Sequence, residues 1–242
     1  MKTKVILFDL DGTLLPMDME AFTRKYFGLL AEKFATYGYD PERLLDAIQA
    51  GVVAMVKNDG AKSNEEVFWE VMEEKYGAAV KSDIALFDAF YRKEFEGARE
   101  ACGYNPQASE TVAKLKERGF QIALATNPLF PQIATENRIR WAGLAPEDFE
   151  CYTTYETSRY CKPNVKYYMD VVQQLQVKPE ECLMVGNDVA EDMIAEELGM
   201  KVFLLTDCLI NREQKDVSAY PGGSFSELME YIAAVTGENE SL

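Results

Sequence analysis

Two aspartates separated by one residue are the side chains of this sequence best suited to chemistry. Asp9 and Asp11 come directly after the apolar run Val5–Phe8, and Gly12 and Thr13 follow them. Such a run is typical of a buried parallel strand, and ligands of open α/β sheets gather beyond the carboxyl ends of the strands. One carboxylate can act as a nucleophile while the other manages protons. The pattern favours a phosphoryl-transfer site; the alternative is that Asp11 and Gly12 only close a β-turn.

Two further pairs of polar residues follow strand candidates. Thr126 and Asn127 end the candidate strand 121–126, where a hydroxyl, an amide and backbone N–H groups can bind phosphoryl oxygens. Lys162 precedes Pro163 after the candidate strand 150–154, and its ammonium can neutralise a phosphoryl group or a carboxylate. Each pair alone has an ordinary alternative, a turn at a strand end in the first case and a solvated loop lysine in the second.

A fourth group of residues brings more acid to a strand end. Gly186, Asn187 and Asp188 close the candidate strand 182–186, and Asp192 follows four residues after Asp188. Paired carboxylates beside a glycine turn suit a hard divalent cation with oxygen ligands. The alternative is a helix N-terminus whose acidic residues complement the helix dipole.

The elements that must position these residues alternate along the chain. Besides the first strand, apolar runs predict strands at 121–126, 150–154, 182–186 and 201–205. Helical patterns lie between and after them, at 106–119, 164–175, 190–198 and 226–234. Alternation of this kind predicts an α/β fold with a doubly wound, parallel, five-stranded Rossmann-like core. The tail 237–242 is expected to be disordered.

The pattern changes between residues 16 and 102, where no strand-like run interrupts a series of helical segments rich in aromatic residues. Asp40 before Pro41 and the capping box that begins at Ser63 mark two helix starts. Aromatic and methionine side chains then recur at helical spacing and are expected to be core: Phe68, Trp69, Met72 and Tyr76. We therefore expect a core domain, 1–15 with 103–242, and a helical domain, 16–102, that hangs over the site as a lid.

Composition excludes several classes of function. The chain has 242 residues, a net charge of -16 and no histidine. Such acidity argues against nucleic-acid binding, and the lack of histidine removes Ser-His-Asp and Cys-His catalysis and His-ligated zinc. The five cysteines show no C-x-x-C spacing, which indicates free thiols and a cytoplasmic location. No segment is expected to be a signal peptide or to span a membrane.

As a set, the four groups resemble the motifs of the haloacid dehalogenase-like superfamily, in its phosphatase type with a helical cap between the first and second motifs. Residues 9–13 resemble the first motif, 126–127 the second, 162–163 the third, and 186–188 with Asp192 the fourth. The resemblance covers the whole chain except the helical insert. The departure is Asn187, which stands between the glycine and Asp188 where the acid more often follows glycine directly.

The resemblance implies a magnesium-dependent phosphomonoester hydrolase that acts on a small phosphorylated metabolite through an aspartyl-phosphate. Asp9 would be the nucleophile and Asp11 the acid and base. Asp9, the Asp11 carbonyl and Asp188 would hold Mg²⁺, with Asp192 behind them, orienting Lys162. The expected phosphate-binding set, in which Lys162 is also catalytic, is Gly12, Thr13, Thr126, Asn127 and Lys162.

Other functions stay open at this stage. A sugar phosphomutase would share the aspartate pair, whereas a dehalogenase would not need Asp11, because a halide leaves without a proton. Phosphonate cleavage would need an activated lysine in the insert, and Lys25, Lys57 and Lys62 are the candidates. A non-catalytic binding member is a further alternative. We expect a monomer or small homo-oligomer with no membrane or nucleic-acid partner.

Four side chains have no assigned role. Cys161 precedes Lys162, where a neighbouring cation can lower a thiol pKa, although an ordinary partly buried residue is the simpler interpretation. Arg24, Lys25 and Arg159 are candidates for contacting an anionic substrate and are equally interpretable as surface charge.

Overall fold

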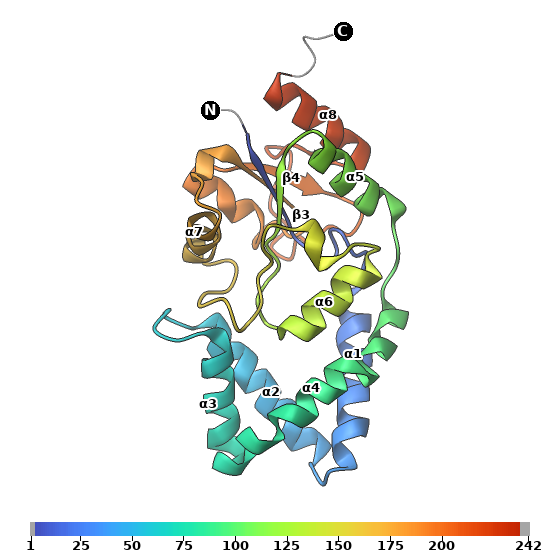
Figure 1. The fold of residues 1–242 in the computed structure, drawn as a ribbon, viewed down its shortest axis with the longest axis vertical. Coiled ribbons are helices and arrows are strands. Elements are labelled where there is room, and N and C mark those ends of the chain that lie inside the picture. Colours follow the sequence, from blue (N-terminus) through green and yellow to red (C-terminus); the bar gives the residue numbers. More distant parts are fainter. Residues whose placement is uncertain (1–2, 238–242) are drawn as a thin grey trace.

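A parallel sheet occupies the upper half of the molecule in Figure 1, and a group of helices lies below it. The structure is a computed structural model and describes residues 3–237. The strands are β1 (Val5–Phe8), β2 (Gln121–Leu124), β3 (Cys182–Gly186), β4 (Lys201–Leu205) and β5 (Gly222–Gly223). All neighbouring strands are parallel, in the order β2-β1-β3-β4-β5. The predicted five-stranded parallel α/β fold is confirmed within these residues.

Helices cover both faces of the sheet, which makes it doubly wound. Ile6 and Phe8 of β1 belong to one apolar cluster with residues of α5 and α8, whereas Val5 and Leu7 belong to a second cluster with residues of α7. The alternation follows because successive side chains of a strand point to opposite faces. The helices here are α5 (Pro106–Glu117), α6 (Gln132–Trp141), α7 (Val165–Gln174) and α8 (Phe225–Thr236), with short 3₁₀ helices η3 (Pro146–Asp148), η4 (Pro179–Glu181) and η5 (Met193–Leu198).

Two predicted elements differ from the observed ones. Residues 150–154 were expected to form a strand, but they form only an isolated bridge between Tyr152 and Leu124 of β2. The backbone pairing ends at Thr153, whose N–H donates to the Leu124 carbonyl while its hydroxyl donates to the Thr126 carbonyl. The fifth strand is the short Gly222–Gly223 at the opposite edge. Residues 190–198 were expected to form an α-helix, but only the 3₁₀ helix η5 forms, at Met193–Leu198. Ala190 and Glu191, whose N–H groups donate to the Asp188 carboxylate, lie in the turn before it.

Residues 19–101 form a helical segment below the sheet (Figure 1). Its elements are α1 (Met19–Ala35), α2 (Pro41–Val56), α3 (Asn64–Tyr76), η1 (Ala78–Asp83), α4 (Ile84–Arg92) and η2 (Glu94–Ala101). The predicted caps are confirmed: Asp40 accepts from the Arg43 N–H at 2.9 Å, and Ser63 forms a reciprocal capping box with Glu66. These caps satisfy backbone groups that would otherwise be unpaired at the helix starts.

The two ends of the helical segment meet at one point. Met17 and Cys102 form an antiparallel bridge, and the Gly103 N–H donates to the Pro16 carbonyl at 2.7 Å. The chain therefore enters and leaves the segment side by side, and we call these two points, at Met17 and Cys102, the paired chain crossings. This pairing falls at the expected boundaries near residues 16 and 102; the division into two domains stays a prediction.

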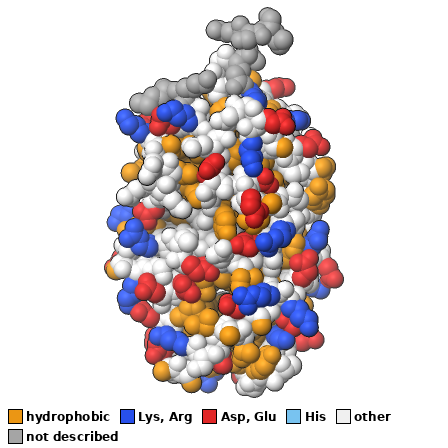
Figure 2. All heavy atoms as spheres, in the orientation of Figure 1, with side chains coloured by type: hydrophobic (Ala, Val, Ile, Leu, Met, Phe, Trp, Pro, Cys, Tyr) orange, Lys and Arg blue, Asp and Glu red, His pale blue; other side chains and the backbone are white. Residues whose placement is uncertain are grey.

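The remaining sequence predictions concern surface and termini. Acidic and basic side chains are interspersed over the face in Figure 2, and hydrophobic side chains gather in its lower half. All five cysteines are free. Among residues 3–237, every helix is too short or too polar to cross a bilayer. The expected disordered tail falls, apart from Gly237, outside the described residues.

Candidate active site

The Asp9 carboxylate lies at the carboxyl end of β1 and is almost fully buried. Its N–H donates to the Val185 carbonyl at 2.9 Å, so the sheet ladder continues to the aspartate itself. Its Oδ1 accepts from Nζ of Lys162 at 2.9 Å. The backbone of the sheet and a buried ammonium together fix the orientation of Asp9.

Lys162 is a buried cation shared by two carboxylates. It is 1% exposed, and its Nζ also donates to Asp192 Oδ1 at 2.6 Å. The other oxygen of Asp192 accepts the Asp188 N–H at 2.9 Å. A Cβ at Gly186 would lie 2.1 Å from Asp192 Oδ2, so only glycine allows this approach. Hydrogen bonds thus connect Asp9, Lys162, Asp192 and Asp188 in turn, from the end of β1 to the loop after β3.

Burial and neighbouring charges have opposite effects on the pKa values of Lys162 and Asp192. Burial lowers the pKa of Lys162, but the Asp192 and Asp9 carboxylates outweigh that effect and raise the pKa well above its usual value. Burial raises the pKa of Asp192 against the opposing effect of the Lys162 ammonium, and Asp9 adds to the rise. One ammonium thus serves two carboxylates that are largely removed from water, and the group carries an excess of negative charge.

Asp11 forms an ion pair with Arg138, a residue of α6 that is fully buried. The Arg138 guanidinium also lies over the Phe130 ring, 4.2 Å from its centroid. Asp11 Oδ2 is the paired oxygen, whereas Asp11 Oδ1 is buried without a hydrogen-bond partner. Burial raises the pKa of Asp11, partly offset by Arg138, and Asp9 raises it further. A carboxyl group with a raised pKa and an unpaired oxygen is suited to proton transfer.

The loop that carries Asp11 is closed by Asn187. Gly12 has φ of +87°, and a Cβ there would lie 2.2 Å from Asn187 Nδ2. Thr13 Oγ1 donates to Asn187 Oδ1 at 3.0 Å, and Asn187 Nδ2 donates to the Cys208 carbonyl at 2.6 Å. Asn187 therefore connects the loop after β1 to the loop after β3.

The second motif contributes one side chain with an unused acceptor. Asn127 Nδ2 donates to Glu191 Oε2 at 3.0 Å, and Asn127 Oδ1 is buried without a partner. The neighbouring Thr126 is held through its carbonyl, which accepts from Thr153 and Tyr167 at 2.6 and 2.8 Å. Burial raises the pKa of Glu191, against the effect of Lys162 and with a contribution from Asp188.

These residues surround a polar cavity of about 210 Å³. Six of the predicted site residues line it: Asp9, Asp11, Thr126, Asn127, Asp188 and Asp192. Lys162 lies behind Asp9 and Asp192, not in the lining. Gly12 and Thr13, expected to bind phosphate, also do not line the cavity, because their contacts are with Asn187.

The donor set of this polar cavity fits a hard divalent cation. Five lining residues are acidic, and the basic residue in the lining is Arg212. Excess acid and unpaired oxygens on Asp11 and Asn127 leave room for a cation with oxygen ligands. Among residues 3–237, no three acidic or cysteine side chains converge as a metal centre. The expected set uses only two carboxylates, those of Asp9 and Asp188, with the Asp11 carbonyl.

Sequence reasoning missed Arg138 and Glu191. Arg138 occupies a position of α6 at which the spacing from the buried residues Ala134 and Trp141 indicates an inward-facing side chain. A charged residue within an apolar stripe was the available signal. Its partner Asp11 is 127 positions away in the sequence, which no local pattern reveals.

The other unassigned charges lie away from the site. Arg24 pairs with Glu20, Lys25 with Glu100 and Arg159 with Asp170, all on the surface. Cys161 is buried between Asn64 and the Met55 carbonyl. Burial raises the pKa of the Cys161 thiol to about 12, so the surroundings do not produce a lowered thiol pKa beside Lys162.

Comparison with known proteins places this arrangement in a family. The family model described as haloacid dehalogenase-like hydrolase matches residues 3–198. The chain is similar to a ribulose-1,5-bisphosphate 5-phosphatase of Halopiger xanaduensis, 29% identical over 82% of this chain and 83% of that protein. It is also similar to a phosphoglycolate phosphatase of Vibrio parahaemolyticus, 26% identical over 95% and 96% of the two chains.

A solved structure shows the same fold. The phosphatase from Thermococcus onnurineus matches with a TM-score of 0.59 and 19% identity, over 95% of this chain and 98% of that one. With a family model that matches residues 3–198 and with relatives named as phosphatases, the chain belongs to the haloacid dehalogenase-like hydrolases, as an enzyme of their phosphatase type.

Proposed function

We propose that this protein is a magnesium-dependent phosphomonoester hydrolase that acts on a small phosphorylated metabolite through an aspartyl-phosphate on Asp9. One observation carries the proposal. Asp9, oriented by Lys162, and Asp11, with one unpaired oxygen, line the same polar cavity. The relatives named as phosphatases of ribulose bisphosphate and phosphoglycolate support a small phosphorylated substrate.

In the first step, the oxygen of Asp9 that Lys162 does not hold attacks phosphorus in line. A bond forms between this oxygen and phosphorus, and the bond from phosphorus to the ester oxygen breaks. Asp11 gives its proton to the leaving alkoxide, so that a neutral alcohol departs. The raised pKa of Asp11 supports this role, because it increases the protonated fraction of the carboxyl group near neutral pH.

In the second step, the Asp11 carboxylate takes a proton from the attacking water. The water oxygen bonds to phosphorus, the Asp9–phosphorus bond breaks, and inorganic phosphate and free Asp9 result. Because Arg138 holds one Asp11 oxygen, the other oxygen alternates between donor and acceptor. Arg138 is thus a positioning residue for the proton transfer.

The surrounding residues stabilise charge. Asp9, Asp188 and the Asp11 carbonyl would hold Mg²⁺, which reduces the repulsion between an anionic nucleophile and an anionic ester. Thr126 and Asn127 would contact phosphoryl oxygens. Lys162, held by Asp192, keeps Asp9 oriented. Gly12 and Thr13 would supply loop geometry, since their N–H groups donate to the Leu15 and Leu10 carbonyls within the loop.

The helical segment 16–102 would act as a lid domain on the core formed by residues 1–15 and 103–242. The paired chain crossings at Met17 and Cys102 support a hinge at this place. Closure over the polar cavity would exclude water before the first step.

The alternative functions have less support. Lys25 and Lys62 are in surface pairs with Glu100 and Glu70, and Lys57 is exposed, so none is placed as a buried Schiff-base lysine. A dehalogenase has no use for Asp11 as an acid. We keep a cytoplasmic monomer or small homo-oligomer as the working expectation.

The deciding experiment is inorganic phosphate release by the purified protein with Mg²⁺, across sugar phosphates, nucleotides, phosphoglycolate and aryl and alkyl phosphates. We expect release that EDTA abolishes and added Mg²⁺ restores. Rapid quenching with labelled substrate should trap a hydroxylamine-labile phosphate on the protein and none on Asp9→Asn. Turnover by a folded Asp9→Asn protein would contradict the mechanism, and a second phosphorylated sugar as product would identify a mutase.

A further inference from the structure

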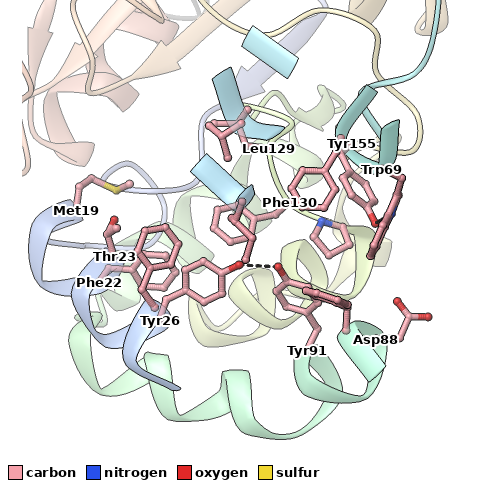
Figure 3. Close-up of a pocket in the computed structure, with 16 residues that line it drawn as sticks. Met19, Phe22, Thr23, Tyr26, Trp69, Asp88, Tyr91, Leu129, Phe130 and Tyr155 are labelled. Carbon is pink, nitrogen blue, oxygen red and sulfur yellow. Dashed lines mark hydrogen bonds between the residues drawn. The ribbon is translucent and has the colours of Figure 1, made fainter. Parts of the chain in front are cut away.

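A second cavity, of about 220 Å³, lies between the helical segment and the core. Figure 3 shows its walls: Phe22 and Tyr26 come from α1, Trp69 from α3 and Tyr91 from α4. The core closes it with Leu129, Phe130, Pro131 and Tyr155. We call it the aromatic cavity, because aromatic rings from both parts of the molecule line it.

The aromatic cavity adjoins the polar cavity. Met19, Leu129 and Phe130 line both. Leu129 lies just after the second motif, in a tight turn in which its N–H donates to the Asn127 carbonyl at 2.8 Å. A molecule whose phosphoryl group lies at Asp9 therefore meets Leu129 and Phe130 next, and beyond them the aromatic cavity.

The lining of this aromatic cavity is apolar and almost uncharged. Tyr26 and Tyr91 share one hydrogen bond between their hydroxyls, at 2.7 Å, in which one hydroxyl donates and the other accepts (Figure 3). Burial raises the pKa of Tyr26 to about 12, so this hydroxyl is neutral at physiological pH. Trp69 Nε1 donates to the Tyr155 hydroxyl at 3.4 Å. Among the residues described, the charged group in the lining is the Asp88 carboxylate, on α4 beside Tyr91.

This chemistry selects against a second anionic group on the substrate. A bisphosphate, a pyrophosphate or a phosphorylated carboxylic acid would place an anion against aromatic rings and Asp88, with no lysine or arginine of the described residues in the lining. Desolvating such an anion without a partner is costly. An apolar group gains about 25 cal/mol for each Å² of surface that it buries.

We infer that the physiological substrate is a phosphomonoester whose alcohol or phenol carries an apolar, ring-sized group, which fills the aromatic cavity while the phosphoryl group lies at Asp9. The inference rests on the proposed phosphatase function and specifies its leaving group. A dry apolar cavity of about 150 Å³ accommodates benzene, so the aromatic cavity has room for one ring with substituents.

The test compares esters of similar intrinsic reactivity. The compounds 2-phenylethyl phosphate, ethyl phosphate and phosphoglycolate are all phosphates of primary alcohols, and they differ in the group attached beyond the reacting bond. We expect kcat/KM for 2-phenylethyl phosphate to exceed the other two values by at least about tenfold, since buried apolar groups discriminate by that order. Equal or higher values for phosphoglycolate or ethyl phosphate overturn this inference and leave the phosphatase proposal standing. No release from any ester overturns both.

A pair of variants on α2 tests whether the preference for 2-phenylethyl phosphate arises in the aromatic cavity. Val52 lines the aromatic cavity, whereas the next residue, Val53, is 51% exposed. Val52→Trp fills the cavity and should lower the preference for 2-phenylethyl over ethyl phosphate at least about tenfold. Val53→Trp adds the same side chain outside and should keep the preference. If both variants change this preference equally, the aromatic cavity is not the binding site of the apolar group.

Competition provides a measurement that needs no variant. With wild-type protein and ethyl phosphate as substrate, 2-phenylethanol should inhibit competitively, and glycolate at the same concentration should not. If Val52→Trp does not fold, this competition and the wild-type preference decide the question. Inhibition by glycolate that equals inhibition by 2-phenylethanol contradicts the inference.

Discussion

The polar cavity and the aromatic cavity share a wall and have opposite chemistry. Five acidic residues line the polar cavity, at the carboxyl ends of parallel strands. Mostly aromatic residues line the other, where the Tyr26 and Tyr91 hydroxyls pair with each other and the Tyr155 hydroxyl accepts from Trp69. Leu129 and Phe130 belong to both linings. Under the proposed function, the reaction and the choice of leaving group would depend on different elements that line two adjoining cavities.

The two cavities also differ in how their side chains are held. In the polar cavity, ion pairs and backbone N–H groups fix each carboxylate, as Lys162 fixes Asp9 and Asp192. In the aromatic cavity, ring packing holds the side chains, as between Tyr26 and Phe95, whose centroids are 5.5 Å apart. Directional bonds preserve one geometry, whereas apolar packing tolerates replacement by residues of similar volume. Mutations should therefore have sharper effects in the polar cavity.

The largest effect is expected for Asp9→Asn. Loss of the nucleophile should reduce phosphate release by more than about 10⁴-fold for every ester, while calorimetric binding of 2-phenylethanol stays unchanged, because the aromatic cavity is intact. The control is the thermal unfolding temperature, which should stay close to that of the wild type. Loss of alcohol binding in a folded variant would break the separation between the two cavities.

Asp11→Asn should reduce hydrolysis of alkyl phosphates by roughly 10²- to 10⁴-fold, the usual contribution of a general acid or base. With acetyl phosphate, whose leaving carboxylate needs no proton, the first step should persist and the second should fail. The hydroxylamine-labile phosphoenzyme should then accumulate. A quench experiment that finds no more phosphoenzyme than in the wild type would show that Asp11 has no part in the second step.

Arg138→Met tests the buried ion pair beside the shared wall. Removal of one partner leaves the Asp11 carboxylate unpaired and should lower the free energy of unfolding by about 3 kcal/mol. The matched control is Arg140→Met on the same helix, where the side chain is exposed and pairs with Glu136, with an expected change within about 0.5 kcal/mol. Denaturant unfolding measures both, and equal changes would mean that the Asp11 contact contributes nothing to stability.

The smallest effect concerns Cys161, which lies where the helical segment meets the core. Burial raises its thiol pKa to about 12, so the reactive thiolate is scarce at pH 8 and increases only as the pH approaches that value. A thiolate-specific reagent at pH 8 should label the partly exposed Cys208 and leave Cys161 unlabelled. Cys208→Ser should remove this rapid labelling of the protein. Rapid labelling of Cys161 would indicate that the segment opens readily from the core.

Sequence patterns predicted the ends of β1, β3 and β4, because the chemistry at these strand ends is local. The run before Asp9 and the glycine before Asn187 are each readable within a few residues, and six predicted side chains do line one cavity. The pair Gly222–Gly223 offers no side chains from which a strand could be predicted. Arg138 was missed because its partner is fixed by tertiary packing alone.

The aromatic cavity shows a second limit of sequence patterns. Phe68 and Trp69 were predicted to be core, and both are buried. The same two rings also line the aromatic cavity. Helical spacing identifies an inward-facing side chain in either case, since a ring that fills a core and a ring that borders a cavity have the same periodicity. The difference depends on how α1, α2, α3 and α4 dock.

The paired chain crossings at Met17 and Cys102 have an evolutionary consequence. An insert whose two ends lie side by side can be lengthened, shortened or exchanged for another without moving the strands that it interrupts. The residues that pair β1 with β2 and β3, and so position Asp9, all lie outside residues 16–102. Under the proposed division into core and lid, new leaving groups can be acquired by changing the helical segment alone, while the residues proposed to cleave the phosphate ester stay unchanged.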